Sequence, residues 1–378
     1  MIPVFEPIIG EEEIEFAIDA LRKGELSGTF GQYLERFENS FAAYCGCKYG
    51  IAVSNGTAAL QVAVAAAGIG SGDEVLISSC TNIATALAVV HNNAIPVPID
   101  SEAETWNLDL DLIEEKITPL TKAIIPVHHL GHPVDMDRVM EIARKYNLMV
   151  IEDAAEAHGA TVRNKRVGGF GDMACFSFYA NKVITTGEGG MVTTNDKHLA
   201  DRLKLLRNLG FTTPRFRHEV LAYNFRMTGY QAAIGCAQFE KIDKIIIEKR
   251  RIAETYNRYF MGVEGIRLPI EKEWAFNVYW MYGIVIEKGF GKTRNELGTA
   301  LREAGIDTRT FFCPMNQQPC LQPYLKASDR VAPVSDSLWE NGMYLPSSYN
   351  LTDETIKHIA DTIKAIGQKN KRPRMVHA

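Results

Sequence analysis

Gly56 and Thr57 belong to the first of three short segments whose residues could carry out chemistry. They lie in SNGTAAL, directly before an alanine-rich stretch that is expected to be helical. Backbone N–H groups at the start of a helix attract anions, so a phosphate can bind there, with Gly56 allowing close approach and Thr57 adding a hydroxyl. Most such segments are only helix caps, so this motif alone is a weak indication.

Two neighbouring carboxylates form the second segment, VIEDAAEAHGA, in which Glu152 and Asp153 end an apolar run. Ligands of an open parallel sheet gather at the carboxyl ends of its strands, which makes a carboxylate at this point a candidate for a site. A helix cap explains it equally well. Because side chains alternate along a strand, Glu152 and Asp153 are not expected to face the same pocket.

Lys182 lies in the third segment, FSFYANKVITTGEGG, just after another apolar run. A single lysine is usually a solvated surface group, but this one follows a phosphate cradle and a strand-end carboxylate. Pyridoxal phosphate needs these three groups: a lysine for the Schiff base and for proton transfer, a carboxylate at the pyridine nitrogen, and an anchor for the phosphate. The combination therefore predicts an enzyme that uses pyridoxal phosphate.

The elements that must position these residues can be predicted from hydrophobic periodicity. Short runs rich in Val and Ile alternate with segments of helical period, and the runs cover residues 74–78, 94–100, 122–128, 148–153, 173–179 and 189–194. This alternation predicts an α/β domain with a mostly parallel sheet covered on both faces. One intervening helix is expected to stop at Gly68, and another to bury Met136, Val139, Ile142 and Ala143.

A change in pattern after Gln231 suggests a second domain. A long charged helical stretch there is expected to lead out of the large domain, which gives domains 1–245, including the N-terminal segment, and 246–378. The second domain is expected to be a smaller α+β unit with a strand at 277–287 and helices at 293–304 and 352–366. The basic tail 367–378 is interpreted as a solvated end.

Composition excludes several other classes of protein. With 41 basic and 46 acidic residues the net charge is -5, which does not favour nucleic acid as a partner. No signal peptide or membrane-spanning run is present, so we expect a cytoplasmic protein without a membrane partner. The seven cysteines are odd in number and form no CxxC pair, which predicts buried, reduced thiols. His128 and His129 of HHLGH are expected on opposite sides of a strand, so no metal site is predicted.

Four segments together resemble a known family. SNGTAAL, VIEDAAEAHGA, FSFYANKVITTGEGGMVTTND and YNFRMTGYQAAIG are similar, in order and spacing, to the DegT/DnrJ/EryC1/StrS sugar aminotransferases, which are pyridoxal phosphate enzymes of fold type I. The resemblance covers nearly the whole chain. It implies a large domain with a mostly parallel seven-stranded sheet, a smaller C-terminal α+β domain, and transfer of an amino group from L-glutamate to a keto sugar nucleotide. Within the family the chain looks most like the GDP-perosamine synthases, which aminate C4 of GDP-4-keto-6-deoxymannose.

The resemblance also implies roles for single residues. Lys182 would be the Schiff-base lysine, and Asp153 would contact the pyridine nitrogen. Ala155 would pack on one face of the ring, and Glu156 would lie near the ring hydroxyl. The phosphate would be bound by Gly56, Thr57, Ser177 and Asn224. Because Asn224 would come from the other subunit, the resemblance implies a homodimer with shared active sites. Related dehydratases have histidine in place of the lysine, so Lys182 favours amino transfer.

Some positions depart from the pattern of the family. Asn82, in SSCTNIATA, replaces an aromatic residue that usually stacks on the cofactor ring, and an amide contributes less dispersion, so cofactor binding is weaker or another residue stacks. Asn316, in CPMNQQP, replaces a histidine and would lie at the substrate. HHLGH replaces the usual HLYG. The cations of PRFRHE are candidates to contact the phosphates of a nucleotide: Arg215, Arg217 and His218. An exposed run of charges is an equal alternative.

Two alternative functions stay open. The acceptor could be another nucleotide-linked keto sugar, a keto-cyclitol or a small keto phosphate. The protein could also be a regulator that binds the cofactor without turnover, although intact Lys182 and Asp153 count against this. The sequence does not encode the nucleotide, the carbon that is aminated or its configuration, because these depend on pocket shape. The resemblance implies supply of an amino sugar for a surface polysaccharide such as an O-antigen.

Overall fold

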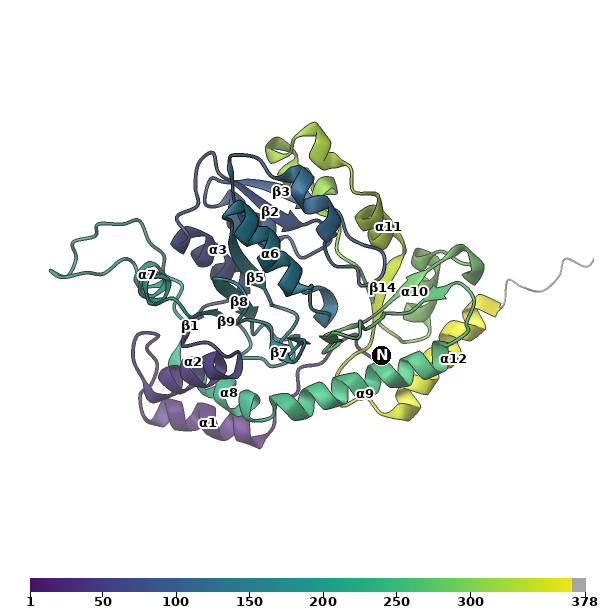
Figure 1. The fold of residues 1–378 in the computed structure, drawn as a ribbon. Helices are drawn as coiled ribbons and strands as arrows, with labels where there is room; N and C mark the ends of the chain where they lie inside the picture. Colours follow the sequence, from purple (N-terminus) through teal and green to yellow (C-terminus); the bar gives the residue numbers. More distant parts are fainter. Residues whose placement is uncertain (369–378) are drawn as a thin grey trace, which may run out of the picture.

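A central sheet of apolar strands lies at the centre of the larger half of the protein, whose computed structural model describes residues 1–368 (Figure 1). Within these residues the sheet has seven strands in the order β1-β9-β8-β5-β4-β2-β3. They are β1 (Tyr49–Val53), β2 (Glu74–Ser78), β3 (Ile95–Ile99), β4 (Thr121–Ile125), β5 (Met149–Asp153), β8 (Met173–Ser177) and β9 (Gly190–Thr194). Only β9 runs antiparallel to its neighbours β1 and β8, so the predicted mostly parallel sheet and α/β class are confirmed.

Helices cover both faces of this sheet, as parallel strands require. On one face α3 (Gly56–Ala66) packs with α4 (Ala84–Val90) and α7 (Lys197–Arg207) against alternate residues of the strands. The opposite face is covered by α6 (Met136–Tyr146) and by α2 (Gln32–Tyr44), and α1 (Glu11–Arg22) packs on α8 (Gly229–Glu240) beside it. The short helix α5 (Ile113–Lys116) follows β3. As predicted, α3 ends before Gly68, which has a positive φ, and α6 buries Met136, Val139, Ile142 and Ala143.

The remaining elements form a smaller unit around a four-stranded antiparallel sheet with the order β10-β12-β14-β13. Its strands are β10 (Ile266–Arg267), β12 (Tyr282–Ile286), β13 (Arg309–Thr310) and β14 (Gly342–Leu345), and its helices are α10 (Arg294–Glu303), α11 (Pro333–Asn341) and α12 (Asp353–Gln368). A third small sheet joins β6 (Thr161–Val162), β7 (Lys165–Arg166) and β11 (Ala275–Phe276). The predicted basic tail lies, from residue 369 on, outside the described residues.

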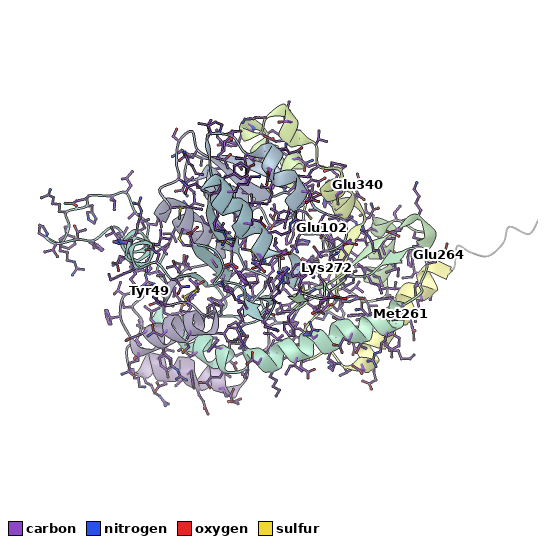
Figure 2. All side chains as sticks on the ribbon, in the orientation of Figure 1. Tyr49, Glu102, Met261, Glu264, Lys272 and Glu340 are labelled. Atoms are coloured by element: carbon purple, nitrogen blue, oxygen red, sulfur yellow. The ribbon has the colours of Figure 1, made fainter. Side chains whose placement is uncertain are left out.

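Two features of this half differ from the expectation. The charged stretch is divided into α8 and α9 (Ile242–Phe260), with Lys241 between them. The predicted strand 277–287 is shorter, because the side chain of Asn277 accepts the backbone N–H of Tyr279, which has a φ of 48°, and so turns the chain before β12 begins. In Figure 2, Met261 at the end of α9 lies on the opposite side of the molecule from Tyr49 of β1.

The domain boundary predicted near residue 246 falls inside the continuous helix α9, and it stays a prediction. The first residues of the chain contact the smaller unit: Ile2 bridges to Ile306, and the backbone N–H of Glu6 donates to Ser348. Conversely, Met315 and Leu321 of the C-terminal half pack into the core around α3. The two proposed domains therefore exchange short segments.

The cysteines depart in part from the prediction. All seven are free, but only five are buried, since Cys313 is partly exposed and Cys320 is exposed. No helix between residues 1 and 368 combines the length and the apolar character needed to cross a membrane.

Phe41 lies at the centre of an aromatic cluster between α2 and β8. Its side chain is fully buried, and its ring centroid lies 4.8 Å from that of Phe176 and 5.2 Å from that of Phe178. Phe41→Ala is expected to lower the free energy of unfolding by about 3–5 kcal/mol, because it removes buried contacts and leaves a cavity. Urea unfolding measures the change. Phe216→Ala, at a side chain that is 74% exposed, is the control and should change stability by only about 0.5 kcal/mol; equal losses in both variants would contradict this account of the core.

Candidate active site

A cavity of about 650 Å³ opens where β5 and β8 end, at the carboxyl edge of the large sheet. Its wall is formed by the start of α3, the segment between β2 and α4, and the segments that follow β5 and β8. The structure therefore brings together eight residues that the sequence assigns to the cofactor: Gly56, Thr57, Asn82, Asp153, Ala155, Glu156, Ser177 and Lys182. This is the edge at which an open α/β sheet binds its ligands.

The start of α3 provides the predicted anion cradle. Asn55 caps the helix by accepting the N–H of Ala58 at 2.8 Å, and the N–H groups of Gly56 and Thr57 have no acceptor within the helix. A Cβ atom on Gly56 would lie 2.7 Å from the Cβ of Ser177. Only glycine allows the end of β8 to approach the helix so closely, which places the Ser177 hydroxyl beside the cradle.

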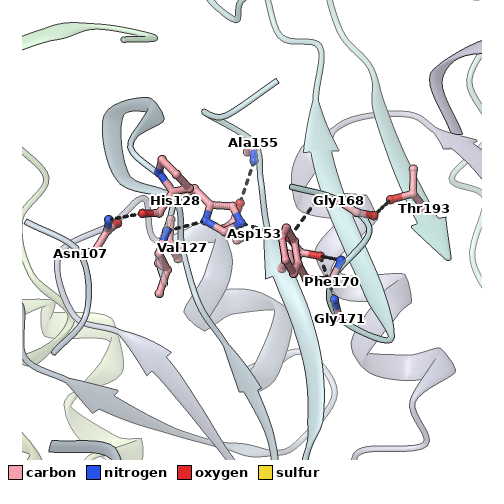
Figure 3. A network of polar contacts seen from close by, with 12 residues as sticks. Asn107, Val127, His128, Asp153, Ala155, Gly168, Phe170, Gly171 and Thr193 are labelled. Atoms are coloured by element: carbon pink, nitrogen blue, oxygen red, sulfur yellow. Dashed lines mark hydrogen bonds and ion pairs between the residues drawn. The ribbon is translucent and has the colours of Figure 1, made fainter. Parts of the chain in front are cut away.

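Asp153 is a buried carboxylate fixed by two donors, of which Ala155 is labelled in Figure 3. Thr85 of α4 donates its hydroxyl to Oδ2 at 2.7 Å, and the N–H of Ala155 donates to Oδ1 at 3.2 Å. Burial raises the pKa of Asp153, while these hydrogen bonds and the charge of Lys182 oppose the rise. Thr85 was not predicted, because nothing in the local sequence indicates that this helix residue faces the end of β5.

Glu152 points to the other side of β5, as the alternation of side chains predicts. It accepts N–H groups from Gly168, Phe170 and Gly171 at 2.8–2.9 Å, and its Oε2 lies 3.3 Å from Nε2 of His128 (Figure 3). Burial acts to raise the pKa of Glu152, but these hydrogen bonds outweigh it and the pKa is lowered. Glu152 thus stabilises the loop beneath the site.

The expectation for HHLGH was wrong in its geometry. β4 ends at Ile125, and residues 129–131 form a 3₁₀ turn in which Leu130 has a φ of 51°. His128 and His129 therefore do not alternate along a strand; each faces a different buried glutamate, Glu152 and Glu156. Among the described residues, no three His, Cys, Asp or Glu side chains are grouped so that they could bind a metal ion.

Lys182 enters the cavity from a turn after β8. Its Nζ lies 4.0 Å from Oε1 of Glu156 and 4.1 Å from the ring centroid of Trp280. Burial lowers the pKa of Lys182, and Glu156 and Asp153 oppose this. Burial also raises the pKa of Glu156 to about 7, although Lys182 and the N–H of Leu130 act to lower it. An amine with a lowered pKa is available as a nucleophile and as a proton carrier.

Several lining residues were missed by the sequence analysis. Aromatic side chains from the smaller unit complete the cavity: Trp280, Phe312 and Tyr344. Tyr179, Asn181 and Phe225 line it from the large sheet side. Trp280 lies in the stretch predicted as a strand, but periodicity cannot show that it faces a site built from distant residues earlier in the chain.

Five predicted residues do not line this cavity. Asn316 is buried elsewhere, where its Nδ2 donates to Asp336 at 3.0 Å. Asn224 is exposed and its backbone pairs with Asn208. The others are exposed on the segment after α7, which projects from the body of the protein in Figure 1: Arg215, Arg217 and His218. Their roles stay predictions.

The residues present fit pyridoxal phosphate. A glycine-lined helix start can bind its phosphate, the buried carboxylate of Asp153 can contact a protonated ring nitrogen, and Lys182 lies in the same cavity. The buried Oδ1 of Asn181 has no partner among the described residues and is a further polar group available to a ligand. Asn82 lines the cavity, and its Oδ1 accepts the N–H of Ala84 at 3.0 Å.

Comparison with known proteins agrees with this site. Residues 7–364 match the model of the DegT/DnrJ/EryC1/StrS aminotransferase family. The chain is 40% identical over 360 residues to a GDP-perosamine synthase of Caulobacter vibrioides, covering 95% of this chain and 96% of that protein. It is 41% identical over 364 residues to the GDP-perosamine synthase of Escherichia coli O157:H7, covering 96% and 97%.

A solved structure is also similar. The crystal structure of DesV from S. venezuelae, in complex with a ketimine intermediate, has a TM-score of 0.89 and 34% identity and covers 96% of this chain and 95% of that chain. The predicted fold, the aminotransferase class and its dependence on pyridoxal phosphate are confirmed. The protein belongs to the DegT/DnrJ/EryC1/StrS aminotransferase family.

Proposed function

We propose that this aminotransferase moves the amino group of L-glutamate to the keto group of a sugar nucleotide, at C4 of GDP-4-keto-6-deoxymannose. The observation that carries the proposal is the arrangement of Lys182, Asp153 and the start of α3 around one cavity. The choice of sugar rests on the relatives named GDP-perosamine synthase, which match this chain over nearly their whole length.

Different residues of the cavity would have different roles in amino transfer. Bound pyridoxal phosphate supplies an electron sink for the substrate carbon that loses its proton. Gly56, Thr57 and Ser177 would bind the phosphate, and Asp153 would keep the ring nitrogen protonated. Lys182, the one cation among the lining residues described, would carry the proton to and from the reacting carbon. Glu156 would lie at the ring hydroxyl, and the surrounding aromatic side chains exclude water.

Lys182→Ala is expected to reduce kcat by roughly 10³-fold or more, because the cavity loses both its nucleophile and its proton carrier. The protein loaded with pyridoxal phosphate is mixed with L-glutamate, and the loss of its visible absorption band and the formation of 2-oxoglutarate are followed. Addition of GDP-4-keto-6-deoxymannose should then restore the band and yield a GDP-linked amino sugar. The control is Lys357→Ala, at an exposed lysine of α12.

Each outcome of this experiment has a definite meaning. Full activity in Lys182→Ala would remove the proposed mechanism. A wild-type protein that binds the cofactor but ignores glutamate would support a different donor or a regulator without turnover. Reaction with glutamate, followed by amination of a different keto sugar, a keto-cyclitol or a keto phosphate, would keep the mechanism and replace the acceptor.

Glu156 gives a pH dependence of stability whose sign can be worked out. Its pKa is about 7 in the folded protein and 4.5 as the reference value. The folded state therefore binds more protons between these values, so the contribution to stability is fully present below about pH 4.5 and is lost as the pH rises through 7. Over this window the loss is on the order of 3 kcal/mol.

Glu156→Gln should remove this pH dependence in the cofactor-free, full-length protein. Urea unfolding at several values between pH 5 and pH 8 should show that the wild type loses stability relative to Glu156→Gln as the pH rises. The exposed Glu303→Gln variant is the control and should follow the wild type. A wild type and Glu156→Gln that keep a constant difference across this range would contradict the assignment.

We also propose a homodimer with two shared sites, in the cytoplasm. Asn224 and Phe225 support the sharing: Phe225 lines the cavity of its own chain, while Asn224 is exposed and available to a second copy. Large exposed apolar side chains on α1 and the loop after it support an interface: Ile14, Ile18, Leu21, Leu26 and Phe30. Seven free thiols agree with a reducing compartment.

Mixing two impaired variants tests the shared sites. Lys182→Ala lacks the amine, and Asn224→Asp places a negative charge beside the phosphate of the partner site. In a mixed dimer, one site combines Lys182 of one chain with Asn224 of the other, so activity should return after the two variants are dissociated and reassociated together. Verified mixed dimers without regained activity would refute shared sites, and a monomer in light scattering would refute the dimer.

A further inference from the structure

Trp280 forms the wall of the cavity that faces the amino group of Lys182. The ring centroid lies 4.1 Å from Nζ, and only 2% of the residue is exposed. The indole Nε1 donates to the backbone carbonyl of Asn181 at 2.6 Å, so the ring is joined directly to the residue before Lys182. The side chain of Trp280 therefore contacts the amino group of Lys182 and is also oriented by a hydrogen bond to the residue before that lysine.

Lys249 of α9 fixes the backbone of Trp280 from the other side. Its Nζ donates to the carbonyl of Trp280 at 2.9 Å and to that of Ser347 at 2.6 Å. This lysine is 1% exposed, and within residues 1–368 no carboxylate forms an ion pair with it. Buried lysines are rare unless their charge is satisfied, and burial lowers the pKa of Lys249 to about 7. The burial of this amine costs free energy, and its two hydrogen bonds fix the carbonyls of Trp280 and Ser347 relative to each other.

The other groups that face Lys182 contact its amine less directly. Glu156, after β5, is 4.0 Å away, and no carboxylate among the described residues forms a hydrogen bond with Nζ. Asp153 at the end of β5 acts through its charge, and its oxygens accept from Thr85 and Ala155. His158 is neutral, since burial and the charge of Lys182 lower its pKa to about 3. The amine of Lys182 thus lies against the face of the Trp280 indole ring.

We propose that Trp280 is a further active-site residue: its ring binds the ammonium group of Lys182 whenever this lysine is not joined to the cofactor, and Lys249 is a positioning residue that keeps the ring there. This inference deepens the proposed function and rests on it for the role of Lys182 in amino transfer. An aromatic face attracts a cation most strongly where water is excluded. Trp280 therefore partly opposes the effect of burial, and it holds the protonated form of the amine close to the reacting carbon between proton transfers.

The pKa of Lys182 in the full-length, cofactor-free protein tests the proposal. Competitive labelling with acetic anhydride over a series of pH values, read by mass spectrometry of the peptide that contains Lys182, gives this pKa. Trp280→Leu, which keeps apolar bulk without an aromatic face, should lower it by about one unit. Trp280→Phe should lower it by less, because a benzene ring attracts cations less strongly than indole.

An unchanged pKa in Trp280→Leu would overturn the proposal. If that variant does not fold, Trp280→Phe decides, and an unchanged pKa there overturns the proposal equally. The spectral reaction with glutamate is recorded separately. A lowered pKa of Lys182 in the variant, together with a wild-type protein that does not react with glutamate, would support the contact and reject the proposed function. Normal amino transfer together with an unchanged pKa would support the proposed function and reject the contact.

A double-mutant cycle separates positioning by Lys249 from a general effect on the fold. Lys249→Met should lower the pKa of Lys182 in the wild-type background and have little effect in the Trp280→Leu background, because its action passes through the ring. Equal shifts in both backgrounds would reject the positioning role. The exposed Lys357→Met is the matched control and should leave the pKa of Lys182 unchanged.

Discussion

The burial of one amine beside two carboxylates is the constraint on which the rest of the structure depends. Burial lowers the pKa of Lys182 and raises those of Asp153 and Glu156, so each group becomes harder to charge as water is removed. Each charge is stabilised by the opposite one, and the two carboxylates also accept hydrogen bonds from fixed donors, the hydroxyl of Thr85 and the N–H of Leu130. A site of this kind is stable only if the sheet edge, α4 and the turn after β4 all meet at one point.

The alternation of side chains on β5 lets one strand serve two purposes. Asp153 faces the cavity, whereas Glu152 binds three backbone N–H groups of residues 168–171 and contacts His128. These contacts lie behind the strand and fix its end. The carboxylate that would contact the cofactor can therefore remain partly free, because its neighbour provides the structural support.

Local sequence predicted the parts of the site that follow directly from strands and helix starts. The predicted apolar runs form strands, and Gly56, Asp153 and Lys182 lie around one cavity because the carboxyl ends of parallel strands share an edge. Thr85 and Trp280 could not be predicted in this way, since their positions depend on packing between distant segments. Two turns account for the errors of secondary structure. A short-range contact of Asn277 shortened the strand before β12. A 3₁₀ turn, whose N–H groups at His129 and Leu130 donate to the distant Asn107 and Glu156, replaced the expected strand at His129.

The two halves of the cavity have different physical origins. The half formed by α3, β5 and β8 is built from contiguous motifs, so its chemistry is fixed by short-range geometry. The half that contains Trp280, Phe312 and Tyr344 comes from segments of the smaller unit, whose position is set by long-range contacts such as those of Lys249 on α9. Changes in those segments can reshape the wall around a sugar without altering the contacts of Asp153 or the start of α3. Substrate choice can therefore vary while the chemistry of amino transfer is retained.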